Sequence, residues 1–179
     1  MWGDGMKAKE ITLCALLTAL ALALSYTEQF IPLQLLIPLP GIKLGLANIV
    51  TLVALYLLRT KYAFWILLAR CFFGAVFGGG ITALLFSLCG GILALEVMAG
   101  VRKIPLLSVY GVSILGAAAH NVGQILAAMA LMHSIYIGAY LPYLLIVAVF
   151  TGLLTGAACA GVLRALPNAS ISLPEGMTR

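Results

Sequence analysis

The sequence predicts an all-α fold, an integral membrane bundle of six transmembrane helices. Hydrophobic residues make up 64% of the 179 residues and charged residues only 8%, whereas about 25% of the residues of a soluble domain are charged. Six apolar runs are each close to the length of about 20 residues that crosses a bilayer as a helix. These runs lack the short alternating pattern of barrel strands. The composition excludes a soluble enzyme, a nucleic-acid-binding domain and a disordered chain.

Each expected helix is an apolar run bounded by charged or helix-breaking residues. The first run follows a polar start, and the second follows a proline-rich segment. The glycine triplet at 78–80 separates the third run from the fourth, and Pro105 and Pro142 mark the turns before the fifth and sixth. The backbone has no water partner within hydrocarbon, so every run must satisfy its N–H and C=O groups as a helix. The spans are expected at 11–30, 42–58, 62–79, 81–100, 106–132 and 141–163.

The positions of the basic residues predict the orientation of the bundle. Because membrane proteins carry excess Lys and Arg in their cytoplasmic segments, both termini are expected to be cytoplasmic. We therefore expect a cytoplasmic tail at 1–10, a six-helix transmembrane domain at 11–164 and a polar cytoplasmic tail at 165–179. Only Lys43 lies in a segment on the opposite side, and only Arg70 lies within a span. The other basic residues flank the spans in pairs on one side: Lys7 with Lys9, Arg59 with Lys61, Arg102 with Lys103, and Arg164 with Arg179.

One long segment on the outer side, residues 30–43, combines apolar residues with Pro32, Pro38 and Pro40. Proline removes a backbone donor and fixes φ, so a continuous helix is not expected there. Two interpretations remain open. The segment is either a re-entrant or interfacial loop in the headgroup region, or a lid that folds over a pocket between the helices.

Polar side chains within the spans define a candidate ligand site, because such groups are costly in hydrocarbon and commonly functional. His120 and Gln124 lie four positions apart and share a helix face, and Arg70 faces the small residue Gly74. A basic, amide-rich cavity suits an anionic or heteroaromatic ligand. The alternative is a polar network that only fixes helix packing. Glu28 is expected to be solvated or to lie at the cavity mouth. The candidate site residues are Lys43, Asn48, Arg70, His120, Asn121 and Gln124.

Small residues at every fourth position allow helices to pack closely. Ala15, Ala19 and Ala23 form such a stripe in the first span, among large apolar residues. The stripe either packs within the bundle or faces lipid, where it would receive a partner. The stripes that contain Gly74 in the third span and Gly152 in the sixth are expected to hold the bundle together.

The residue patterns of several common kinds of active site are missing from the sequence. The chain has one aspartate, Asp4, so it has no aspartate pair that would hold Mg²⁺ and diphosphate. It has no phosphate-binding loop of the G-x-x-x-x-G-K-[ST] kind and no H-E-x-x-H or G-x-S-x-G motif. The four cysteines lie apart in apolar runs, without metal or disulfide spacing. We expect no catalytic residue, metal or cofactor, and no nucleic acid partner.

Two motifs resemble those of one bacterial membrane-protein family. The run from Pro38 to Leu52, PLPGIKLGLANIVTL, and the run from Gly116 to Gln124, GAAAHNVGQ, are similar to the hallmarks of the heptaprenyl diphosphate synthase component I family, also called Gx transporters. The resemblance covers essentially the whole chain. This family is grouped with the substrate-binding S components of energy-coupling factor (ECF) transporters. The grouping implies a bacterial inner-membrane location, six helices, a ligand site toward the outer face and a lid after the first helix.

The resemblance implies two alternative functions. In the first, the chain captures a small, anionic or ring-containing molecule for an importer. It would dock through Ala15, Ala19 and Ala23 on a transmembrane coupling subunit, and two ATPase subunits would supply the energy. In the second, it is a non-catalytic membrane component of heptaprenyl diphosphate synthase, with a soluble synthase subunit as partner. Prenyl diphosphate synthases hold Mg²⁺ and diphosphate with two Asp-rich motifs, which a single aspartate cannot build. A purely structural membrane anchor is the third hypothesis.

Overall fold

The computed structural model describes residues 8–30 and 43–166, and these residues are helical apart from short connections. Most of the expected N-terminal tail, most of the 30–43 segment and nearly all of the C-terminal tail lie outside the described residues. Each of the six expected spans is represented by an α-helix, which confirms the all-α prediction. The helices are α1 (Ala8–Thr27), α2 (Asn48–Leu57), α3 (Thr60–Gly74), α4 (Gly80–Val101), α5 (Val109–Met132) and α6 (Leu141–Ala165), with the short helical turns η1 (Glu28–Phe30), η3 (Ala75–Gly79) and η4 (Ile135–Tyr140).

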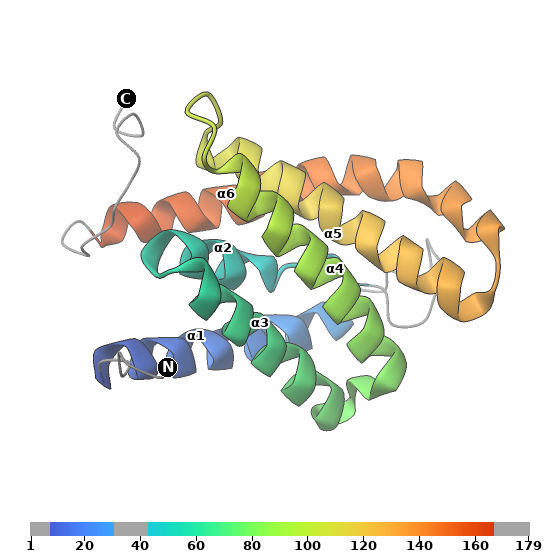
Figure 1. Ribbon diagram of the computed structural model, residues 1–179, viewed down its shortest axis with the longest axis horizontal. Helices are drawn as coiled ribbons and strands as arrows, with labels where there is room; N and C mark the ends of the chain where they lie inside the picture. The colour runs from blue at the N-terminus through green and yellow to red at the C-terminus, as the bar shows by residue number, and fades with distance from the viewer. Residues whose placement is uncertain (1–7, 31–42, 167–179) are drawn as a thin grey trace, which may run out of the picture.

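Successive helices run in opposite directions along the bundle (Figure 1). The starts of α1, α3 and α5 and the ends of α2, α4 and α6 lie toward one side, where the α2–α3 and α4–α5 connections carry their basic pairs. Five of the described helical segments are long and apolar enough to cross a membrane, and α2 is a shorter apolar helix. The chain is therefore a helical membrane protein.

α2 begins at Asn48, later than the expected start at residue 42. The residues before it, here called the 43–47 segment, are not helical. Gly45 within this segment has a φ of +83°, a left-handed conformation that favours glycine. The N–H of Asn48 donates to the Gly45 carbonyl at 2.9 Å and starts the helix from this turn. Sequence reasoning extended the span because the residues are apolar, whereas the turn conformation at Gly45 delays the helix.

Glycines set the distances between α4, α5 and α6. A Cβ added to Gly123 of α5 would lie 2.6 Å from the carbonyl oxygen of Cys89 on α4. One added to Gly152 of α6 would clash with the backbone of Ile114 on α5, so the expected packing role of Gly152 is confirmed. Gly74 of α3 differs, because the nearest atom to an added Cβ is Leu22 Cδ2 at 4.0 Å. This glycine leaves open space between α3 and α1 instead of a tight contact.

The glycine triplet at 78–80 lies at the break between α3 and α4, as the sequence predicts, although α3 itself already ends at Gly74. The helix widens into the π-type turn η3, and Gly80 then adopts a φ of +70°. Gly80 has no neighbour within 4 Å of an added Cβ, so conformation and not space favours glycine there. Pro142 lies in the first turn of α6, the position where a missing N–H is tolerated.

The close approach at Gly123 predicts a specific loss of stability. Gly123→Ala should lower the free energy of unfolding by about 1–3 kcal/mol, because α4 and α5 must separate to admit the methyl group. Gly161→Ala is the matched control, since nothing lies within 4 Å of a Cβ at this position in α6. Thermal unfolding in detergent measures both variants. Equal midpoints for the two would show that the α4–α5 contact is looser than described.

Candidate functional site

The 43–47 segment is held in place by side chains from two helical elements. The backbone N–H of Lys43 donates to Gln124 Oε1 at 2.8 Å, and Gln124 Nε2 donates to the Lys43 carbonyl at 2.8 Å. On the other side, the carboxylate of Glu28 accepts the backbone N–H of Leu46. Gln124 and Glu28 thus provide hydrogen-bond partners for backbone groups that lie outside the helices and have no helical partner. Gln124 therefore positions Lys43, and its amide nitrogen and oxygen are both engaged by backbone.

Arg70 and Asn48 form the second part of the site. Arg70 is 3% exposed, and its Nη2 donates to Asn48 Oδ1 at 3.2 Å. A Cβ on Gly91 of α4 would lie 3.2 Å from Arg70 Nη2, so this glycine leaves room for the guanidinium. Arg70 Nε and Asn48 Nδ2 are buried without a hydrogen-bond partner among the described residues. Two donors in an apolar bundle are thus left available to an acceptor.

His120 is packed between two glycines. The ring is 2% exposed, and a Cβ on Gly45 or Gly90 would lie within 2.9 Å of it. Neither ring nitrogen makes a well-formed hydrogen bond within the described part of the chain, although the Gly90 backbone lies beside the ring. His120 thus packs over the turn that delays α2. It joins the same cluster as Asn48, as the sequence predicts.

Asn121 serves a different contact. Its Nδ2 donates to the Leu144 carbonyl at 2.7 Å and ties α5 to α6. Its Oδ1 is buried and unpaired among the described residues. Like Asn48, His120 and Gln124, Asn121 does not line the basic pocket that contains Lys43 and Arg70. The polar-network interpretation therefore fits Asn121 better than a ligand contact does.

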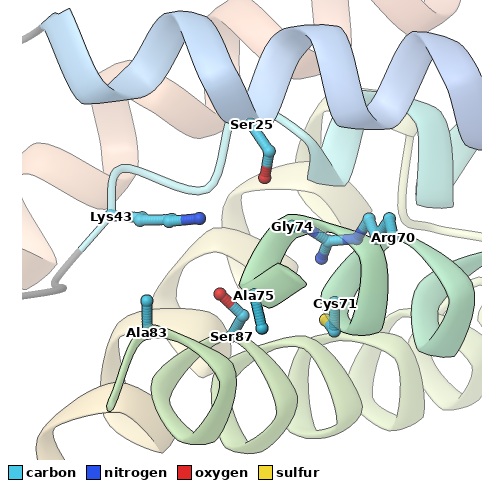
Figure 2. A pocket seen from close by; sticks show the side chains of 8 residues that line it. All are labelled: Ser25, Lys43, Arg70, Cys71, Gly74, Ala75, Ala83 and Ser87. Atoms are coloured by element: carbon cyan, nitrogen blue, oxygen red, sulfur yellow. The ribbon is translucent and has the colours of Figure 1, made fainter. Parts of the chain in front are cut away.

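The two cations line a narrow pocket between α1, α3 and α4 (Figure 2). The Lys43 side chain extends from its segment across the gap, and the guanidinium of Arg70 and the hydroxyl of Ser25 also reach into it. The space is too narrow to hold a free water molecule, so a bound group would enter by displacing side chains. The residues that line it are Ser25, Lys43, Arg70, Cys71, Gly74, Ala75, Ala83 and Ser87.

Glu28 corrects the sequence-based expectation of a solvated carboxylate. It is 4% exposed, because η1 turns it inward toward the start of α2. Burial raises the pKa of its carboxyl group, and the Leu46 N–H with the charges of Arg70 and Lys43 oppose that rise. Burial likewise lowers the pKa of the Lys43 ammonium, which the charge of Glu28 opposes. The site therefore carries two basic groups and one carboxyl group.

The pocket also includes residues that sequence reasoning missed. Ser25 lies three positions before Glu28, across the junction of α1 and η1, so the i,i+3 spacing of the pair could have been recognised as a polar face. Ser87 gives no such signal, because a single serine in an apolar helix is common. Among the described residues, no group of three or more His, Cys, Asp or Glu side chains could hold a metal ion.

The alanine stripe of α1 lies on the outside of the bundle. Ala15, Ala19 and Ala23 are all exposed, together with the neighbouring Leu16 and Leu20. The stripe therefore does not pack against the described helices. Of the two interpretations of this pattern, packing within the bundle is wrong for these three residues.

The fold and the site define a helical membrane protein with a buried basic pocket and no recognisable catalytic motif. The family model for heptaprenyl diphosphate synthase component I matches residues 17–162. The chain belongs to this family, which is a non-catalytic component of the synthase. This agrees with the sequence prediction that the chain is not itself an enzyme. No curated protein and no solved structure matches the chain.

The paired hydrogen bonds of Gln124 predict an unusual pH dependence in a variant. Gln124→Glu keeps the acceptor but replaces the amide donor by an oxygen that faces the Lys43 carbonyl. At neutral pH this should lower the free energy of unfolding by about 1–3 kcal/mol. At low pH the protonated carboxyl can donate to that carbonyl, so the deficit relative to the wild type should shrink. Thermal unfolding at several pH values measures this, and a variant as stable as the wild type at neutral pH contradicts it.

Proposed function

We propose that the chain is the non-catalytic membrane component of a polyprenyl diphosphate synthase and that its basic pocket binds the anionic group of a ligand. The observation that carries the proposal is the pair Lys43 and Arg70, which share a buried pocket in an otherwise apolar bundle. Family membership supports the synthase context.

The chemistry of the pocket favours an oxygen-rich anion. Burying a cation in a low-dielectric interior is costly unless it is paired. The single carboxyl group of Glu28 already accepts a backbone N–H and faces two cations. Arg70 Nε and Asn48 Nδ2 have no acceptor among the described residues. A phosphate or diphosphate group in the pocket would supply an acceptor for Arg70, which lines it, and would neutralise the excess positive charge.

The synthase role also implies a location and a partner. We propose that the chain lies in the bacterial inner membrane with both termini in the cytoplasm, which follows from the basic residues at the α2–α3 and α4–α5 connections. The catalytic partner would be a soluble, Asp-rich synthase subunit, because this chain contains one aspartate and catalysis needs Mg²⁺ bound to diphosphate.

Neutral variants of the pocket test the proposal. Lys43→Met and Arg70→Met should each weaken binding of inorganic pyrophosphate at least about tenfold, because each removes one charge-assisted contact. Lys61→Met is the control, since Lys61 is exposed at the start of α3. Isothermal titration calorimetry in detergent gives the affinities, and Lys43→Met keeps the test valid where Arg70→Met fails to fold.

The same variants, reconstituted with a soluble prenyl diphosphate synthase, test the synthase role. Wild-type chain and Lys61→Met should alter the chain length or yield of the synthase products, and the pocket variants should not. Products that are identical with and without the wild-type chain would refute the synthase assignment. Equal pyrophosphate affinity in all variants would refute the anion site.

The exposed alanine stripe favours a second candidate function, the substrate-capture subunit of an importer. Ala15, Ala19 and Ala23 leave a smooth strip on α1 along which a helix of another subunit can approach closely. The partner would be a transmembrane coupling subunit that carries two ATPase subunits. In this role the basic pocket would hold a small anionic or ring-containing nutrient.

Bulk on the alanine stripe distinguishes the second candidate from the first. Ala19→Leu should abolish co-purification of a coupling subunit and its ATPases from the native membrane, while monomer stability is unchanged. Ala157→Leu, at an alanine of α6 that is also exposed, should retain them. Native mass spectrometry of the gently purified complexes reads out the partners. Absence of ATPase subunits from the wild-type complex would remove this candidate.

A further inference from the structure

A second, wider space adjoins the basic pocket between α1 and α3. This groove has a volume of about 310 Å³, at the lower end of the range for small-molecule sites, about 300–1,000 Å³. Its walls are mainly apolar, and it lies where α1 and α3 end, away from the basic connections. The lining side chains of the walls are those of Leu22, Ala23, Tyr26 and Phe77.

The groove is continuous with the basic pocket. Ser25, Lys43 and Gly74 line both spaces. Gly74 has no side chain at this junction, and a Cβ added to it would lie 4.0 Å from the nearest atom. Lys43 reaches toward Gly74 below Ser25 (Figure 2). A cation therefore marks the inner end of a groove whose other walls are mainly apolar.

The other side of the groove faces the surroundings of the bundle. Tyr26 is 55% exposed and Phe77 is 68% exposed, on two helical elements that belong to or adjoin membrane spans. Tyr26 and Phe77 lie at the ends of the candidate spans Glu10–Thr27 and Thr60–Phe77, so the groove opens toward the bilayer near the ends of these spans. A wholly polar anion would leave these apolar walls unused, whereas a hydrocarbon chain can lie along them and remain in contact with the bilayer.

We propose that the groove is a lateral opening for a single-chain amphiphile. Its anionic head would reach Lys43 and Ser25, and its hydrocarbon chain would lie between α1 and α3 against Tyr26 and Phe77. The proposal rests on the proposed function, because the head uses the same basic pocket. It adds the class of ligand and the route: a lipid-like molecule that enters sideways from the bilayer.

Three probes separate the contribution of the anionic head to binding from that of the hydrocarbon chain. Purified protein in phosphatidylcholine nanodiscs is titrated with inorganic pyrophosphate, farnesyl diphosphate and farnesol, with empty nanodiscs subtracted. Farnesyl diphosphate should bind at least tenfold tighter than either fragment. Equal affinity for pyrophosphate and farnesyl diphosphate would overturn the lateral opening and leave the anion site intact. Binding of neither would overturn both, and farnesol as tight as farnesyl diphosphate would overturn the role of the head.

Truncation of the two exposed aromatic side chains of the groove tests where the hydrocarbon chain of the ligand lies. The double variant Tyr26→Ala with Phe77→Ala should lose most of the preference for farnesyl diphosphate over pyrophosphate, while its pyrophosphate affinity is unchanged. The matched control is Tyr143→Ala with Phe150→Ala, which removes two similarly exposed rings from α6. A preference that persists in the groove variant would place the chain elsewhere and overturn the proposal. Equal competition by phosphatidylglycerol would show an ordinary two-chain lipid in the groove and would also overturn it.

Discussion

The side-chain amide of Gln124 makes two hydrogen bonds to the backbone of Lys43, and the arrangement of the site depends on this contact. Non-helical backbone is tolerated at membrane depth only where protein satisfies its polar groups. The 43–47 segment meets that condition through Gln124 on one side and Glu28 on the other. Because the segment is fixed, Lys43 points into the bundle. α2 then starts at Asn48, whose side chain accepts a hydrogen bond from Arg70 at 3.2 Å. The delayed helix thus creates the site.

The charges of the site are better explained by a ligand-binding role than by a purely structural role in helix packing. A structural network in a membrane bundle normally pairs its polar groups, as Asn121 Nδ2 does with the Leu144 carbonyl. Around the pocket, two basic groups share the carboxyl group of Glu28, and Arg70 Nε and Asn48 Nδ2 find no acceptor in the described residues. Glu28 reduces the free-energy cost of burying the two cations, but a net positive charge remains.

Sequence reasoning could predict the helices and most of the polar cluster, because both depend on local pattern. Apolar length places the spans, and a four-residue spacing places His120 and Gln124 on one face. The predicted start of α2 was wrong, because the true start depends on the left-handed conformation at Gly45. The inward turn of Glu28 could not be predicted, because it depends on contact with Leu46, which follows the segment at 31–42. The groove arises from the packing of α1 beside α3, which no single stretch of sequence encodes.

The two candidate functions meet on α1. Ala23 belongs to the exposed stripe on which a partner would dock, and it also lines the groove beside Lys43. A partner helix along Ala15, Ala19 and Ala23 would therefore extend to the edge of the groove. A hydrocarbon chain bound in the groove would in turn change the surface that the partner contacts. Because binding free energies at linked sites are reciprocal, a ligand that alters docking must be altered by it to the same extent. Ligand capture and partner recognition on this helix would therefore be one coupled property in either of the two proposed assemblies.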